Sequence, residues 1–164
     1  MNADTVLPIL DELLPTLKDE HIFDFLHLPL QSGSDEVLER MNRDYDVETW
    51  KDIVERFRTV LPDLTLSTDV IVGFPGEDVE DFERTKEVLR RTEPDIVNVT
   101  RFSPRPGTEA IDMDEKVHSR LKKERSKDLT ELRLGISRER NERFVGREEE
   151  VLFLEEGKGD SIKG

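Results

Sequence analysis

The sequence predicts an α/β fold in which parallel strands alternate with helices. Three apolar segments with the composition of strands, residues 22–30, 64–72 and 95–102, are separated by segments whose apolar residues recur at helical spacing. This order of strand, helix, strand, helix and strand implies parallel strands joined by right-handed crossovers. Each strand ends in small, polar or proline residues, and ligands of such folds bind at the carboxyl ends of the strands.

The first elements are a helix and a strand. Residues 4–19 place apolar side chains at helical spacing, and two prolines within this segment are expected to kink or shorten the helix. Residues 22–30 form the first predicted strand, with Pro29 at its end because proline interrupts a strand's hydrogen bonds. Ser34 is then placed to cap a short helix.

Two amphipathic helices are predicted to connect the three strands. An apolar stripe that begins after Asp46 predicts the first of them, and Pro62 ends it. The strand at 64–72 is almost continuously apolar in its second half, as expected for a strand buried on both faces. The second helix covers 78–91, and Pro94 closes it.

The pattern changes after Gly107. Residues 144–154 read as a strand and 157–161 as a turn-rich loop, so the sequence is expected to stop inside a second, β-rich domain, since one strand does not make a sheet. Between these parts, Asp114 is predicted to cap a long helix with five residues facing inward: Val117, Leu121, Leu129, Leu132 and Ile136.

Composition narrows the class of protein. The chain has 164 residues, of which 34% are apolar and 39% charged, so one domain with a modest core is expected. We expect a cytoplasmic protein without a membrane partner, because no apolar run has the length of a membrane span and no signal pattern opens the chain. The absence of cysteine excludes disulfides, thiolate zinc sites and cysteine-ligated iron–sulfur clusters within this sequence.

Charge is distributed unevenly along the chain. The net charge of −14 opposes binding to nucleic acid and, with its excess of acids, suggests adaptation to high salt. Residues 116–147, however, contain eleven Lys or Arg and five acids. On charge alone this segment is more typical of a solvated helix face with paired charges, and the alternative is an arm that binds a polyanion.

The loop after the second strand is the most informative single segment. Gly73 and Gly76 lack the Cβ atoms that would keep a ligand from the backbone, and Glu77 places negative charge near the start of the next helix. A connection of this kind also occurs in α/β folds without any ligand. The loop by itself therefore does not indicate a ligand site, and the prediction of one depends on polar residues near the ends of the other strands.

Polar residues at or near the ends of the three strands are candidates for binding a ribose, a carboxylate or a phosphate. His27, in contrast, is interpreted as a hydrogen-bonded core residue, the more frequent role of a lone histidine in an apolar strand. We find no serine-protease order of residues, paired metal carboxylates or Walker loop, and therefore predict neither a catalytic side chain nor a metal site. The polar candidates are Gln31, Ser32, Asp69, Ser103 and Arg105.

Four ordered motifs together resemble the radical S-adenosylmethionine methylthiotransferases: residues 27–34, 41–43, 68–77 and 102–108. The resemblance implies a (β/α)6 partial barrel that holds S-adenosylmethionine and a [4Fe-4S] cluster, followed by an RNA-binding TRAM domain. The family's three-cysteine motif is missing here, so the segment alone is expected to be inactive.

The resemblance also divides the chain. Residues 1–112 are expected to form the C-terminal half of the barrel, strands four to six, residues 113–141 a connecting helix, and residues 142–164 the start of a TRAM domain.

Shorter motifs resemble the archaeal and eukaryotic branch that acts on threonylcarbamoyladenosine beside the anticodon of tRNA: residues 43–46, 104–107 and 122–130. Relatives that act on isopentenyladenosine or on a ribosomal protein are the nearest alternatives. A different class of alternative is a non-catalytic fragment that binds a nucleoside and RNA.

By the same resemblance, a first group of residues is expected to contact S-adenosylmethionine: Gln31, Ser32, Arg43, Asp69, Ile71 and Gly73. A second group is expected to contact tRNA: Arg105, Lys122, Lys123 and Arg125. Purely structural roles remain open for two of them, because Arg43 is near enough in sequence to pair with Asp44 or Asp46 and Asp69 is able to cap a backbone amide.

Overall fold

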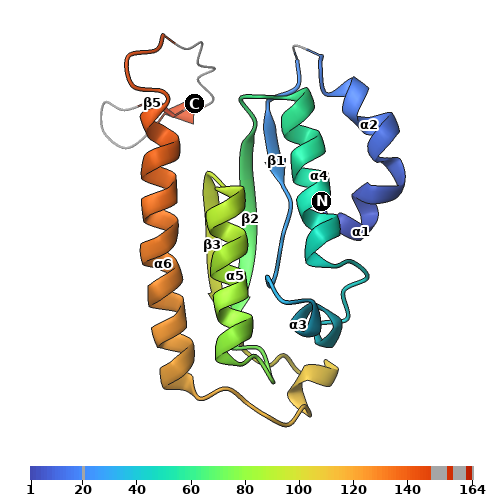
Figure 1. Cartoon of the computed structure of the whole chain (residues 1–164), viewed down its shortest axis with the longest axis vertical. Helices are drawn as coiled ribbons and strands as arrows, with labels where there is room; N and C mark the ends of the chain where they lie inside the picture. Colours follow the sequence, from blue (N-terminus) through green and yellow to red (C-terminus); the bar gives the residue numbers. More distant parts are fainter. Residues whose placement is uncertain (20, 149–154, 157–161, 164) are drawn as a thin grey trace.

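The computed structural model describes residues 1–19 and 21–148, and the backbone of 155–156 and 162–163. Its central element is a parallel sheet in the order β1 (Phe25–His27), β2 (Thr65–Val72) and β3 (Ile96–Arg101), shown in Figure 1. The register pairs Leu26 with Leu66 and Asp69 with Asn98. The predicted parallel α/β arrangement is therefore confirmed.

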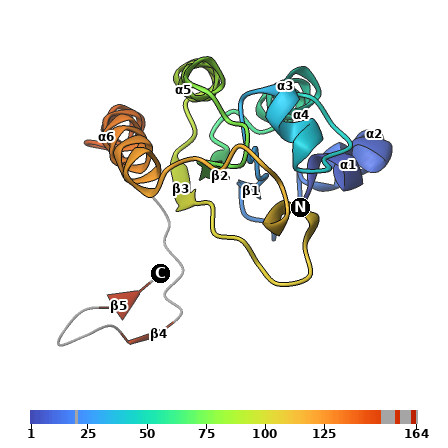
Figure 2. The ribbon, with the colours of Figure 1, turned by 90° about the horizontal axis from the view of Figure 1, so that it is seen from below.

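Two of the longer helices lie on one side of this sheet. Helices α4 (Val47–Val60) and α5 (Val79–Thr92) cover one face, and the loop after β3, with the short helix η2 (Glu109–Ile111), passes on the other side (Figure 2). Side chains alternate along β2, so Leu66 and Val70 are buried beneath the helices while Asp69 points away. We call the second face, which carries His27, Asp69 and Asn98, the open face.

Helix α6 (Ser119–Glu142) stands beside β3 (Figure 1). Its buried residues Leu129 and Ile136 belong to the main core. Near its C-terminal end, Arg140 Nε and Arg143 Nη2 donate to Asp95 Oδ1 over 3.0 and 3.1 Å. These contacts fix α6 at the amino end of β3, where Asp95 precedes the strand.

The core between sheet and helices is built around α4. Trp50 and Phe57 are almost completely buried, and Trp50 Nε1 donates to the Leu28 carbonyl over 3.2 Å. This bond joins α4 to the segment that leads from β1 to the carboxyl edge of the sheet. The apolar stripe predicted for this helix is thus confirmed in position and in facing.

Both helices that cross between the strands begin with an acidic cap. Asp46 accepts a hydrogen bond from the Thr49 amide over 2.7 Å at the start of α4. Asp78 and Asp81 form a reciprocal capping box at the start of α5. These bonds satisfy amide groups that the first turn leaves without partners, which explains why the helices begin where they do.

Replacing Asp46 with alanine is expected to lower the free energy of unfolding by about 1 kcal/mol, because the Thr49 amide loses its acceptor. That amide bond also lowers the pKa of Asp46. The contribution of the carboxylate is therefore present above the pKa of the unfolded chain and is lost as the pH falls through the folded value. Urea unfolding at neutral and acidic pH measures both effects, and a loss of equal size at every pH would contradict the second.

The first strand is shorter than the predicted 22–30. Pro29 has no N–H to donate, the Leu30 amide donates to the Thr68 hydroxyl over 2.9 Å, and only an isolated bridge joins Gln31 to Val70. The N-terminal helix is also broken, as its two prolines predicted, into α1 (Ala3–Val6), η1 (Leu7–Ile9) and α2 (Leu10–Thr16). The short helix after Ser34 is α3 (Asp35–Arg40), although the Ser34 side chain makes no capping bond.

The prediction that Asp114 caps the long helix is wrong. Helix α6 begins at Ser119, and His118 Nδ1 accepts from the Arg120 amide over 3.2 Å. The preceding segment is held elsewhere, because Glu115 has a φ of 58° and its carbonyl accepts from the Gly76 amide. Of the five residues expected to face inward, Leu121 is instead exposed, and Val117 lies before the helix.

The C-terminal prediction is only partly within the described structure. Phe144 lies in the turn after α6 rather than in a strand, and 149–154 are outside the described residues. Strand β4 (Glu155–Glu156) pairs antiparallel with β5 (Ile162–Lys163), and the predicted loop between them is also outside the described residues. None of the described helices is long and apolar enough to cross a membrane.

Candidate functional site: a basic pocket at the carboxyl edge of the sheet

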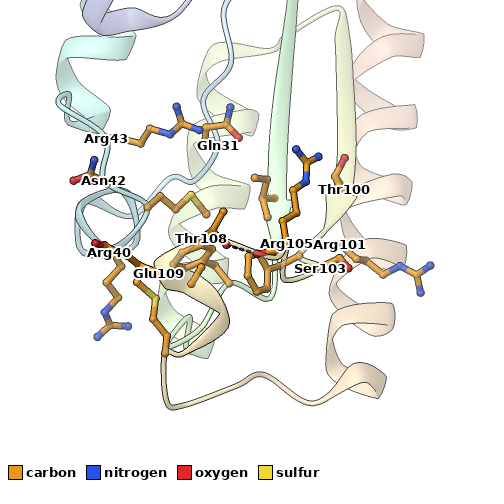
Figure 3. Close-up of a pocket in the computed structure, with 16 residues that line it drawn as sticks. Gln31, Arg40, Asn42, Arg43, Thr100, Arg101, Ser103, Arg105, Thr108 and Glu109 are labelled. Atoms are coloured by element: carbon orange, nitrogen blue, oxygen red, sulfur yellow. Dashed lines mark hydrogen bonds between the residues drawn. The ribbon is translucent and has the colours of Figure 1, made fainter.

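A pocket with a volume of 560 Å³ opens at the carboxyl ends of the three strands (Figure 3). Gln31 comes from the end of β1, Ile71 and Phe74 from β2 and the following loop, and Phe102 and Arg105 from the segment after β3. This is the edge of the sheet where the topology predicts a ligand. Of the residues expected to bind S-adenosylmethionine, Gln31, Arg43 and Ile71 line this pocket, as does Ser103.

The pocket is basic within an acidic chain. No acid among the described residues forms an ion pair with any of its arginines, in a protein with a net charge of −14. Unpaired guanidinium groups suit a carboxylate or a phosphate. The charged lining consists of Arg40, Arg43, Arg101, Arg105 and a single acid, Glu109.

Arg43 is the clearest candidate within this lining. Its Nε atom is buried without a hydrogen-bond partner, and such groups are rare in folded proteins. The alternative in which Arg43 pairs with Asp44 or Asp46 is not found among the described residues, and Asp46 instead caps α4. Arg43 therefore has unused hydrogen-bonding capacity at the wall of the pocket.

The apolar part of the pocket suits a flat ring. The Phe74 and Phe102 rings meet edge to face, with centroids 4.9 Å apart, and Ile71 lies beside them in the lining. Aromatic and aliphatic walls of this kind accept the faces of a nucleobase. The combination of guanidinium groups and apolar walls fits a ligand that has both a charged group and a purine.

Gln31 is held by its backbone while its side chain is directed to the pocket (Figure 3). Its amide donates to the Asp69 carbonyl over 2.8 Å, and its carbonyl accepts from the Ile71 amide over 2.9 Å. Its φ of 66° is uncommon for a residue other than glycine and is imposed by these two bonds. Unusual backbone conformations of this type are typical of functional sites.

Three of the expected cofactor contacts, Ser32, Gly73 and Asp69, do not line the pocket. Ser32 is buried, and its hydroxyl accepts from the Ser34 amide over 3.2 Å. Gly73 has a φ of 75°, but a Cβ atom there would collide with Lys122 Cγ rather than with a ligand in the pocket. The space that glycine leaves at this position is therefore filled by a side chain of α6.

Asp69 lies on the open face, outside the pocket lining. Its two carboxylate oxygens accept from His27 Nε2 over 3.0 Å and from Asn98 Nδ2 over 2.9 Å. The carboxylate thus joins side chains of three strands and does not cap a backbone amide. His27 is hydrogen-bonded as expected, but it is not a core residue, since its side chain is 40% exposed.

The open-face histidine is a functional candidate that the sequence interpretation missed. The hydrogen bond from His27 Nε2 to Asp69 fixes the orientation of the imidazole ring. The other ring nitrogen, Nδ1, has no hydrogen-bond partner among the described residues. The available signal was that each of the three strands carries polar residues next to apolar ones. In parallel strands, such residues gather on one face when their registers match.

The residues of α6 that were expected to bind RNA differ in exposure. Arg125 is buried and its Nη1 lies 2.6 Å from Glu77 Oε1, and Lys122 Nζ donates to the Phe102 carbonyl over 3.1 Å. Only Lys123 is exposed, so a direct RNA contact by Arg125 does not fit this structure. Along the outer surface of α6, Arg120, Lys127 and Arg138 each pair with a glutamate four residues later, which supports the solvated-face alternative.

Metal ligands are not grouped in the part of the chain that the structure describes. No cluster of three or more His, Cys, Asp or Glu side chains is found there. The sequence also contains no cysteine, so cysteine ligands for an iron–sulfur cluster are not among its 164 residues.

Comparison with known proteins gives three kinds of match. The profile of the radical SAM superfamily matches residues 2–89. A protein of Pyrococcus abyssi named "Probable threonylcarbamoyladenosine tRNA methylthiotransferase" is 50% identical over 162 residues, which are 99% of this chain and 38% of that protein. One of the same name from Methanocaldococcus jannaschii is 46% identical over 159 residues, 97% of this chain and 37% of that protein.

A bacterial relative has a different named substrate. The "tRNA-2-methylthio-N(6)-dimethylallyladenosine synthase" of Thermobifida fusca is 48% identical over 138 residues, 84% of this chain and 28% of that protein. The chain thus spans less than two fifths of the length of the curated relatives it matches.

A solved structure shows the same fold. Coproporphyrinogen III oxidase (HemN) from Escherichia coli, described as a radical SAM enzyme, aligns with a TM-score of 0.58 at 17% identity. The alignment covers 88% of this chain and 31% of that chain.

Proposed function

The chain belongs to the radical SAM superfamily, and from this premise we propose that it is the C-terminal half of the catalytic barrel of a tRNA methylthiotransferase. The observation that carries the proposal is the basic, aromatic-walled pocket at the carboxyl ends of the strands. Its combination of unpaired arginines and apolar walls fits S-adenosylmethionine, which has a carboxylate and an adenine. The names and the identity of the relatives support the methylthiotransferase assignment.

The residues of the pocket would bind and orient the cofactor. Arg43 has an unused buried guanidinium nitrogen for the carboxylate, Gln31 offers an amide, and Ile71 and Phe74 offer apolar contact to adenine. When bound, S-adenosylmethionine with a reduced [4Fe-4S] cluster would supply radical chemistry, and the part of this chain would be binding, orientation and exclusion of water. Asp69 is retained in this proposal as the residue that orients His27 on the open face.

Replacing Arg43 with glutamine is expected to weaken binding of S-adenosylmethionine about tenfold or more, the effect of losing one charged hydrogen bond. Calorimetric titration of the chain measures this affinity. Arg56 provides the matched control, because it pairs with Asp11 away from the pocket. Equal affinities of the wild type and the Arg43→Gln variant would remove Arg43 from the site.

We propose threonylcarbamoyladenosine in tRNA as the substrate. Relatives with that named substrate match 93% to 100% of this chain, whereas two relatives named for dimethylallyladenosine match 82% and 84%. Mass spectrometry of tRNA nucleosides from a deletion strain tests the assignment. Loss of the methylthio group from threonylcarbamoyladenosine is expected, and its persistence together with a loss at dimethylallyladenosine would favour the second substrate.

A second candidate function is binding without redox chemistry. The lack of cysteine favours it for this polypeptide, because thiolates are the usual cluster ligands. After anaerobic treatment with iron and sulfide, the chain is expected to remain colourless and still to bind S-adenosylmethionine. A visible absorption band that survives desalting would contradict this expectation.

A further inference from the structure

Helix α6 reaches the wall of the pocket with two basic side chains, Lys122 and Arg125. These residues come from a helix that does not line the pocket. They contact the loop after β2 and the segment after β3, which supply the aromatic residues Phe74 and Phe102. Their contacts assign them a role different from binding a polyanion.

Arg125 is buried against the start of α5. Its Nη1 donates to Glu77 Oε1 over 2.6 Å and to the Glu77 carbonyl over 3.0 Å, and its Nη2 donates to the Asp78 carbonyl over 2.8 Å. The side chains of Arg125 and Glu77 are 5% and 4% exposed. One guanidinium group thus donates hydrogen bonds to three oxygen atoms of Glu77 and Asp78, which directly follow the loop of residues 73–76.

Glu77 transmits this contact to the loop itself. Its second oxygen, Oε2, accepts from the amides of Gly73 and Phe74 over 2.6 and 3.3 Å. Burial raises the pKa of Glu77, and Arg125 together with these amides opposes the shift. Without Arg125 the buried carboxylate would lose its only ion-pair partner among the described residues, and its hold on the two amides would weaken.

Lys122 makes a parallel contact with the segment after β3. Its Nζ donates to the Phe102 carbonyl and lies 5.0 Å from the centre of the Phe102 ring. Its aliphatic stem fills the space that Gly73 leaves by having no Cβ. Because Phe102 packs against Phe74, both basic residues act on the same aromatic wall.

We propose that Arg125 and Lys122 are positioning residues that hold the aromatic wall of the pocket and thereby set its affinity for an adenine-containing ligand. Neither residue lines the pocket, so the effect passes through Glu77, Phe74 and Phe102. The identity of the ligand rests on the proposed function, whereas the hold on the loop does not. The basic character of this part of α6 is thus explained by contacts inside the protein.

The test compares Arg125→Met with Arg120→Met in the full chain. Both changes remove one arginine from α6, but Arg120 is exposed, and Glu124 is its only ion-pair partner among the described residues. Hydrogen exchange of the Gly73 and Phe74 amides, followed by NMR, is expected to become about tenfold faster or more in Arg125→Met and to stay unchanged in Arg120→Met. Unchanged exchange in both variants would overturn the proposal.

Binding of S-adenosylmethionine is the second measurement. We expect Arg125→Met to weaken it about tenfold and Arg125→Lys to recover part of the loss, since lysine keeps the charge but has no planar fork. A lower melting temperature with unchanged affinity would mean that the pair is only structural and would overturn the proposal. If the wild-type chain binds no S-adenosylmethionine, the proposed function fails, while the amide exchange still decides whether α6 holds the loop.

Lys122→Met keeps the proposal testable if Arg125→Met does not fold. Methionine retains an apolar stem against Gly73 and removes only the ammonium group from Phe102. This variant is expected to fold and to bind S-adenosylmethionine about twofold to fivefold more weakly than the wild type, the equivalent of about 0.5–1 kcal/mol for a lost cation–π contact. Wild-type affinity in Lys122→Met, with no change in the Phe74 amide, would remove Lys122 from the mechanism.

Discussion

Replacing Trp50 with alanine is expected to lower the free energy of unfolding by about 3–5 kcal/mol, the range for truncating a large buried aromatic residue. Trp50 is 0% exposed, and its indole N–H is satisfied by the Leu28 carbonyl. The loss would be a large share of the total stability of a domain of this size. Because Trp50 is the only tryptophan, urea unfolding must be followed by circular dichroism rather than by fluorescence.

Trp50→Phe is the matched control. Phenylalanine keeps most of the ring volume and removes the indole N–H, and the Leu28 carbonyl still accepts from the Thr68 hydroxyl over 2.8 Å. We therefore expect a smaller loss than in Trp50→Ala. A loss below about 1 kcal/mol for Trp50→Ala would place this residue outside the range seen for buried aromatic side chains.

The alternation of strands and helices was predictable because each element carries its own periodic signal. The stripe that includes Trp50 and Phe57 has the helical period, and the run from Thr65 to Val72 has the composition of a buried strand. Proline and acidic caps mark the ends of these elements within the sequence itself. The fold class therefore follows from local information.

Boundaries that depend on distant contacts were not predictable in the same way. Strand β1 stops at His27 because the Thr68 hydroxyl, about forty residues away, takes the place of a backbone partner. The start of α6 is delayed because Glu115 binds the amide of Gly76. Neither partner is visible in the local pattern, so the predicted strand was too long and the predicted cap was wrong.

The candidate site shows the same division. Gln31 and Ile71, which lie near the ends of strands, line the pocket because the carboxyl edge of the sheet follows from topology. Arg125 was misplaced, because a basic residue on an amphipathic helix looks alike whether it faces solvent or a buried carboxylate. His27 was missed because its partners, Asp69 and Asn98, come from two other strands.

Exposed arginines without an ion-pair partner among the described residues line the pocket, and this predicts where tRNA would be contacted. Arg101 and Arg105 line the pocket, are exposed and form no ion pair with a described acid, whereas Lys127 on α6 pairs with Glu131. An exposed unpaired arginine at the mouth of the pocket is available for a phosphate next to a nucleotide that enters it. We therefore expect tRNA to contact Arg101 and Arg105 rather than α6.

Replacing both Arg101 and Arg105 with glutamine is accordingly expected to lower tRNA affinity and to reduce the slope of log K against log salt by about one for each phosphate contact that is lost. Lys123→Gln with Lys127→Gln removes the same charge from α6 and is expected to change both quantities less. Filter binding or fluorescence anisotropy over a range of salt concentrations measures them. If the Lys123 and Lys127 changes had the larger effect, the RNA contact would lie on α6. Equal small effects in both double variants would place the contact outside the described residues. The net charge of −14 repels RNA in both double variants alike, so it does not produce a difference between them.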